Sequence, residues 1–131
     1  MGVDLTVSPI RHATLDWWLC YERIRFDRDY ELFGQIDKFG RGKRPVVCHP
    51  LPIPVGKRVQ WYGDDGLETI TTNPYGTPLT YIVANEFRKL VIDEYGAGCH
   101  DGISLISDWN RAVMAMLTAM PPDTPVVLYW S

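Results

Sequence analysis

The sequence predicts an α+β fold, with a mainly antiparallel sheet of about 4–6 strands, two longer helices and one short helix. Its 131 residues match the size of a single domain. Short runs of β-branched and aromatic residues lie near both ends and around a Gly-Asp-Asp-Gly turn, and two later segments repeat apolar residues at helical spacing. We therefore expect one α+β domain over residues 1–131, with a packed core supplied by 46% hydrophobic residues.

The first elements are predicted to be two paired strands. Residues 2–8 alternate apolar and polar side chains, which predicts a half-buried strand that ends before Pro9. Residues 14–26 are rich in aromatic and β-branched side chains, which favours a second strand antiparallel to the first. A helix is the alternative for this second segment.

A short helix is predicted next, over about residues 28–38. Asp27 or Asp29 is suited to cap its first turn, and Gly40 to end it. Its apolar face would comprise Leu32, Phe33, Ile36 and Phe39.

Residues 40–56 are predicted to form a loop, because the segment is rich in glycine and carries prolines at alternate positions. Two β-rich runs then flank residues 63–66, Gly-Asp-Asp-Gly, within residues 59–70. Glycine and aspartate at these positions favour a tight turn, so the segment predicts a β-hairpin.

Two further helices and a final strand complete the prediction. Thr77-Pro78 would begin a helix that Gly96 ends, with an apolar stripe of Leu79, Val83, Phe87, Leu90 and Val91. Ser107 would cap the last helix, with Met114 exposed and an inward stripe of Trp109, Val113, Met116, Leu117 and Met120. The almost continuous apolar run at residues 124–130 predicts a central strand.

Charge and composition exclude several classes of function. The net charge is −3, and the basic residues gather only at Lys38, Arg41, Lys43 and Arg44, so we expect no binding to duplex DNA. No segment approaches the roughly 18 apolar residues of a membrane helix, so we expect no membrane partner. The N-terminus lacks the pattern of a signal peptide and the three cysteines are odd in number, which favours a cytoplasmic protein with free thiols.

Catalytic chemistry receives little support. The dipeptides Cys48-His49 and Cys99-His100 do not have the spacing of a zinc site, so we expect no metal and no cofactor. Cys99 would need His12 or His49 as a base, and nothing in the sequence brings these residues together. No phosphate-binding loop, dinucleotide fingerprint, metalloprotease motif or nucleophile elbow occurs. The hypothesis that the protein is an enzyme is therefore less favoured.

Several short segments resemble a group of small proteins encoded by bacteriophages and prophages. The counterparts of that group's "MGCDIH", "DRNYDLF" and "PRGLP" patterns are "MGVDLT", "DRDYELF" at 27–33 and "PLPIP" at 50–54, followed by the apolar end "VVLYW". Val3 and Thr6 replace the Cys and His of that pattern, and "YGTPLT" replaces its His-rich stretch. The resemblance implies origin and general fold, and any histidine or metal chemistry would not carry over.

The resemblance and the missing motifs lead to three hypotheses. The first is a phage or prophage accessory protein that binds a host protein stoichiometrically in the host cytoplasm, with antagonism of a host defence as one purpose of the binding. The second is a sponge for a nucleotide-like signal, and the third is a Cys/His-dependent enzyme; a homo-oligomer is compatible with each. The candidate ligand- or partner-binding residues are Arg25, Arg28, Tyr30, Trp61 and His100.

Overall fold

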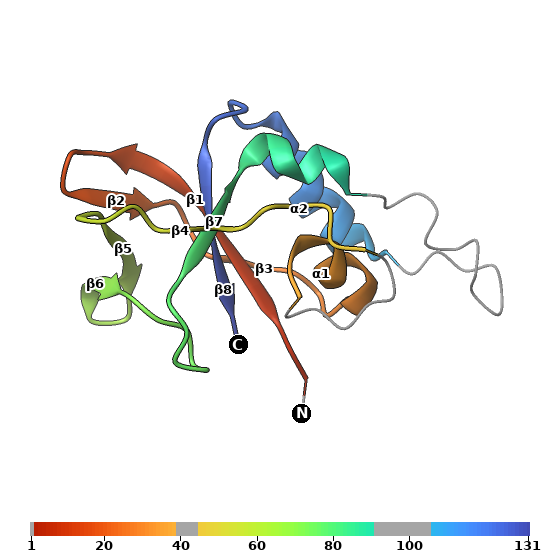
Figure 1. Cartoon of the computed structure of the whole chain (residues 1–131), viewed down its shortest axis with the longest axis horizontal. Helices are drawn as coiled ribbons and strands as arrows, with labels where there is room; N and C mark the ends of the chain where they lie inside the picture. Colours follow the sequence, from red (N-terminus) through yellow and green to blue (C-terminus); the bar gives the residue numbers. More distant parts are fainter. Residues whose placement is uncertain (1, 39–44, 91–105) are drawn as a thin grey trace, which may run out of the picture.

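The computed structural model describes residues 2–38, 45–90 and 106–131. In these residues the chain is mostly β, and one mixed sheet of eight strands curls into a half-barrel (Figure 1). The strands are β1 (Leu5–Ala13), β2 (Trp17–Cys20), β3 (Ile24–Arg25), β4 (Leu51–Pro52), β5 (Arg58–Gly63), β6 (Gly66–Ile70), β7 (Thr80–Val83) and β8 (Pro125–Trp130). The helices are α1 (Tyr30–Ile36), the 3-10 helix η1 (Ala84–Lys89) and α2 (Asp108–Ala119).

The strand order is β4-β7-β8-β1-β2-β5-β6, and β3 pairs with β1 beside this path. Every named pair of strands is antiparallel except β2 and β5, which run parallel. The curl brings the chain that follows β6 back to the chain that precedes β7, where Thr72 and Pro78 form an isolated bridge. The Leu79 N–H donates to the Thr71 carbonyl beside this bridge at 3.2 Å, so the half-barrel is partly closed there.

The predicted α+β class is wrong, and residues 77–90 show why. The expected long helix is replaced by strand β7 and the six-residue η1. Residues 80–83, Thr-Tyr-Ile-Val, are β-branched or aromatic and pair with β8 along their whole length. Their pairing with a central strand overrides the helical spacing of the apolar residues. The predicted end of this helix, with Val91 and Gly96, lies outside the described residues.

The two predicted N-terminal strands are confirmed as antiparallel partners, with different bounds. The second segment forms β2 and β3, which both pair with β1. The first strand does not end before Pro9, because β1 continues to Ala13. Pro9 lacks an N–H to donate, but its carbonyl accepts from the Tyr21 N–H at 2.8 Å, which keeps the neighbouring chain attached at this point.

Other predictions at the level of single elements are confirmed. Asp29 caps α1 by accepting from the Leu32 N–H at 3.0 Å. β5 and β6 form the expected hairpin around residues 63–66. β8 is central, lying between β7 and β1. Strand β4 was not expected, since it lies within the segment predicted as a loop.

Helix α2 begins as predicted but presents a different face. Ser107 accepts from the Asn110 N–H at 3.0 Å, which satisfies a free donor of the first turn. The buried side chains of the helix belong to Asn110, Val113, Met114 and Leu117. Met114 is thus buried rather than exposed, and Trp109 is 52% exposed rather than inward.

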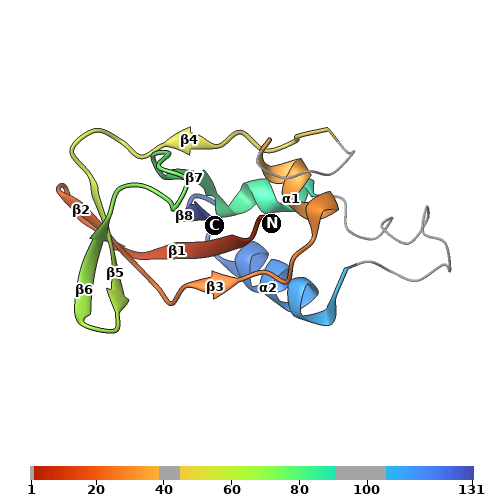
Figure 2. The ribbon, with the colours of Figure 1, turned by 90° about the horizontal axis from the view of Figure 1, so that it is seen from below.

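Apolar side chains gather in two clusters on opposite faces of β8, because successive residues of this strand belong to different clusters. The larger cluster joins the first residues of β1 and alternate residues along β8 to the three helices, which lie together at one end of the molecule in both views (Figures 1 and 2). The smaller cluster, which includes Trp18, Val59, Trp61 and Leu79, fills the inside of the half-barrel. We call the part of the molecule around the larger cluster the helix-covered end, and the part around the smaller cluster the open end.

Candidate functional site

Two of the predicted site residues converge on one carboxylate at the helix-covered end. The Arg25 Nη2 lies 2.5 Å from Asp4 Oδ2. Arg28 binds the same carboxylate with two nitrogens, Nε to Oδ1 at 3.1 Å and Nη2 to Oδ2 at 2.9 Å. The two-point contact fixes the plane of the Arg28 guanidinium, because the fork of an arginine matches the geometry of a carboxylate.

Hydrogen bonding, charge and burial shift the pKa values of the side chains in this cluster. Asp4 is buried beneath the two arginine side chains, which remain 65% and 48% exposed. The hydrogen bond from Arg28 lowers the pKa of Asp4 below its ordinary value, assisted by the positive charge of Arg25 and opposed by burial. The same hydrogen bond raises the pKa of Arg28. Two cations therefore share one anion and leave positive charge facing solvent.

The sheet register brings these residues together. Thr6 of β1 pairs with Arg25 of β3, and Asp4 lies two residues from Thr6 on the same side of the chain. Gly2 supplies the remaining space, because a Cβ added there would lie 2.0 Å from the Arg28 guanidinium carbon. A side chain at position 2 would therefore displace the Arg28 head group.

Trp109 completes the surface from the first turn of α2. Its indole Nε1 donates to the Arg25 carbonyl at 2.7 Å, which fixes an exposed ring against the backbone of β3. The buried Asn110 side chain reinforces this junction by accepting from the Asp27 N–H at 2.7 Å and donating to the Asp27 carbonyl at 3.0 Å. The chain between β3 and α1 is thus held against α2 by side chains.

Tyr30 lies at the edge of the same cluster, where its side chain interacts with Arg28. We call Arg25, Arg28, Tyr30 and Trp109 the arginine–tryptophan surface. An open hollow of about 400 Å³ adjoins it and is lined by Asp4, Arg25, Phe26, Asp27 and Arg28.

The other predicted site residues do not join this surface. Trp61 is 3% exposed in the core of the open end, where its ring meets Tyr129 edge-on at 5.2 Å and Arg23 lies over it at 4.8 Å. His100 lies outside the described residues, as do Cys99 and Asp101.

The described cysteines are poorly suited to chemistry. Cys20 and Cys48 are buried, and burial raises the pKa of each thiol to about 12. A protonated thiol is neither a good nucleophile nor a metal ligand. Within the described ranges, histidine, cysteine and acidic side chains form no group of three or more that would hold a metal ion.

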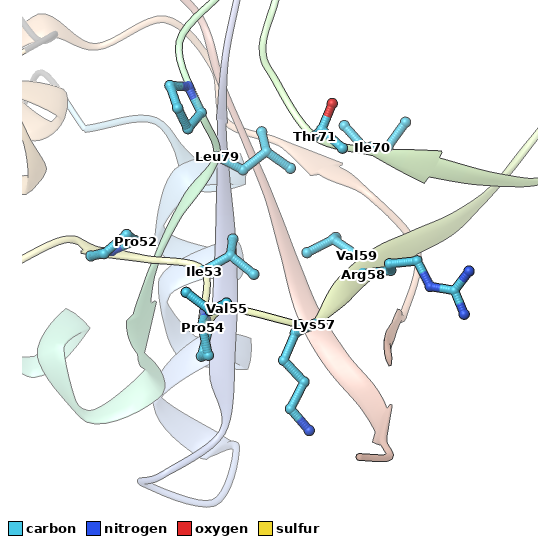
Figure 3. A pocket seen from close by; sticks show the side chains of 12 residues that line it. Pro52, Ile53, Pro54, Val55, Lys57, Arg58, Val59, Ile70, Thr71 and Leu79 are labelled. Carbon is cyan, nitrogen blue, oxygen red and sulfur yellow. The ribbon is translucent and has the colours of Figure 1, made fainter. Parts of the chain in front are cut away.

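A second hollow, of about 270 Å³, lies at the mouth of the half-barrel (Figure 3). The side chains of Ile53, Val59 and Leu79 point toward one another across it, while those of Lys57 and Arg58 point away. Its lining has neither an acidic nor an aromatic residue. It is smaller than the roughly 300–1,000 Å³ of ordinary small-molecule pockets.

Comparison with known proteins adds no functional information, since no family model matches the chain and no curated protein or solved structure matches it significantly. In the described part of the chain, no helix has the length and apolar character needed to cross a membrane.

Sequence reasoning missed two members of the site, Asp4 and Trp109. The alternating pattern of the first strand placed Asp4 on the outer side, without indicating that two arginines would cover it. Antiparallel pairing of the first two strands was the available signal, because it brings Arg25 near Asp4. Trp109 was assigned to the core because it falls on the predicted inward stripe of the helix together with Val113 and Leu117. The helix instead buries Asn110, whose amide binds the chain at Asp27.

Proposed function

We propose that this protein acts without catalysis, by binding a protein partner stoichiometrically through the arginine–tryptophan surface. The resemblance to phage and prophage proteins makes a host protein the expected partner, and antagonism of a host defence the expected purpose. Among the described residues, histidine, cysteine and acidic side chains form no group of three that would hold a metal ion, and Cys20 and Cys48 are buried.

The observation that carries the proposal is an exposed indole that is hydrogen-bonded to the backbone of Arg25, whose side chain shares the Asp4 carboxylate with that of Arg28. Tryptophan, tyrosine and arginine are the residues that most often dominate the free energy of protein association. Here Trp109 is 52% exposed yet held by a hydrogen bond, and Asp4 holds both arginines. Because these side chains are already ordered, a partner would lose less conformational entropy on binding them.

A nucleotide-like ligand fits this surface less well. Asp4 already accepts from both arginines, and Asp27 lines the same hollow, so a phosphate would meet two carboxylates. Phe26 is the aromatic residue in the lining, but it is only 1% exposed and offers no face for a base to stack on, and the exposed Trp109 does not line the hollow. The mouth of the half-barrel, with its apolar walls, offers no better place for a phosphate.

Affinity capture with matched variants tests the proposal. The tagged protein is used to retain partners from a bacterial host lysate, and each retained protein is then titrated in purified form. Trp109→Ala should weaken binding by about thirtyfold or more, the size expected for a hot spot of about 2 kcal/mol. Arg25→Ala should weaken it as well. Tyr62→Ala removes a ring that is 64% exposed on β5 at the open end, and it should bind as the wild type does.

Two outcomes would reject the proposal. In the first, the three variants retain the same partner with the affinity of the wild type. In the second, nucleotides raise the melting temperature of the wild type but not of Arg28→Ala, which would support the sponge instead. Melting temperatures of the variants without ligand serve as the control for folding.

A further inference from the structure

Two aliphatic side chains project almost fully into solvent at the open end. Leu15, in the turn between β1 and β2, is 86% exposed, and Val55, in the turn before β5, is 105% exposed. Both views place these turns side by side at the end of the molecule that has no helices (Figures 1 and 2). The Arg58 N–H donates to the Asp16 carbonyl at 3.0 Å, which joins the two turns directly. We call Leu15 and Val55 the turn tips.

The backbone of both turns is well supplied with internal hydrogen bonds. The Thr14 N–H donates to the Trp17 carbonyl at 2.8 Å, and the Trp17 N–H donates to the Thr14 hydroxyl at 3.1 Å. The Lys57 N–H donates to the Pro54 carbonyl at 3.1 Å, and the Lys57 ammonium binds the Thr14 carbonyl. Paired backbone groups cost less free energy to move out of water than free ones do.

The residues around the turn tips carry positive charge. Residues 11–17 and 54–58 contain three cations, Arg11, Lys57 and Arg58, and one carboxylate, Asp16, so their net charge is +2 with histidine neutral. The whole chain carries −3. Trp17 also belongs to this end, half-buried and with its ring centroid 5.7 Å from that of His12. Two exposed aliphatic side chains, an indole and several cations are thus concentrated at the open end.

We infer that the open end docks on an anionic lipid surface, with Leu15 and Val55 inserted among the acyl chains and Lys57 and Arg58 against the headgroups. Side chains that project from turns suit a deformable bilayer, whereas a protein partner would have to supply two matching pockets. Cations beside the inserted residues add attraction to anionic lipids. We expected no membrane partner because no segment has the apolar length of a membrane-spanning helix, but docking on a membrane surface needs no such segment.

Co-sedimentation with vesicles tests this inference. The wild type should bind vesicles of phosphatidylcholine mixed with phosphatidylglycerol more tightly than vesicles of phosphatidylcholine alone. Leu15→Ser combined with Val55→Ser should weaken the binding by about tenfold or more, since both apolar contacts are lost. Leu67→Ser is the matched control, because Leu67 is 50% exposed on β6, away from the tips, and should leave binding unchanged.

The charge contribution is tested separately. Lys57→Gln combined with Arg58→Gln should weaken binding to the anionic vesicles about thirtyfold, at about 1 kcal/mol for each basic residue near the surface. Arg88→Gln combined with Lys89→Gln removes the same charge from η1 and should have little effect. Failure of the wild type to bind anionic vesicles would overturn the inference. So would equal binding by the wild type and the Leu15/Val55 variant.

Discussion

The helix-covered end and the open end of the molecule are stabilised in different ways. At the helix-covered end, α1, η1 and α2 pack on the sheet, and Phe33 meets Phe26 and Trp130 edge-on in a continuous core. At the open end no helix is present among the described residues, and the sheet curls over its own small cluster instead (Figure 1). A hollow of about 270 Å³ remains at the mouth of that cluster. In the described part of the chain, the larger cluster has 19 buried residues and the smaller one has 7, so a core side chain at the helix-covered end has more apolar neighbours.

The exposed chemistry of the two ends differs as well. The arginine–tryptophan surface is built from charged side chains that a buried carboxylate and backbone carbonyls hold in place. The turn tips are apolar, and the hydrogen bonds behind them join one stretch of backbone to another. Binding at the first surface should therefore be selective for shape and partner charge, whereas binding at the second should depend on apolar area and on the sign of the lipid charge.

Matched leucine substitutions measure the difference in packing, and the largest effect should come from the helix-covered end. Leu117 on α2 is fully buried in the larger core. Leu117→Ala should lower the free energy of unfolding by about 3–5 kcal/mol, because close packing leaves a cavity that cannot collapse. Urea-induced unfolding followed by circular dichroism checks this. A loss of less than about 2 kcal/mol would show that the helix-covered end is loosely packed.

Leu79→Ala is the counterpart at the open end. Leu79 is 2% exposed but lines the hollow at the mouth of the half-barrel, so its neighbours can relax and water can enter (Figure 3). We expect a loss of about 2 kcal/mol in the same urea experiment, at the low end of the range for leucine. If Leu79→Ala costs as much as Leu117→Ala, the two ends are equally well packed and the comparison fails.

The smallest of the three effects concerns pH and belongs to the helix-covered end. The pKa of Asp4 is lowered from 3.8 in the folded protein, so its contacts with Arg28 and Arg25 stabilise the fold above that value. That stability is lost as pH falls below about 3.8 through the folded pKa. Asp4→Asn should therefore be less stable than the wild type at neutral pH, with the gap closing in acid. A gap of the same size at both pH values would contradict the role of Asp4.

Local signals in the sequence predicted several elements well. The Asp29 cap, the turn at residues 63–66 and the Ser107 cap each depend on neighbouring residues, and each is present. The prediction of the fold class was wrong at residues 80–83, because their conformation is determined by pairing with β8, which lies more than 40 residues later in the sequence. Long-range pairing of this kind leaves little trace in local spacing.

The candidate site was predicted in part for the same reason. Arg25, Arg28 and Tyr30 were identified because they remained after capping and burial had been assigned, and the structure brings them together. Asp4 and Trp109 lie far away in the sequence and meet them only through the β1–β3 register and the docking of α2. Trp61 was chosen as an aromatic without knowledge of its burial.

Hydrogen exchange of the protein in complex with its captured partner tests the central claim most directly. If the arginine–tryptophan surface binds the partner, backbone amides of residues 25–30 and 108–111 should become protected, while those of residues 14–17 and 54–58 exchange as in the free protein. Protection confined to the turns that carry Leu15 and Val55 would contradict the claim, since the partner would then occupy the open end.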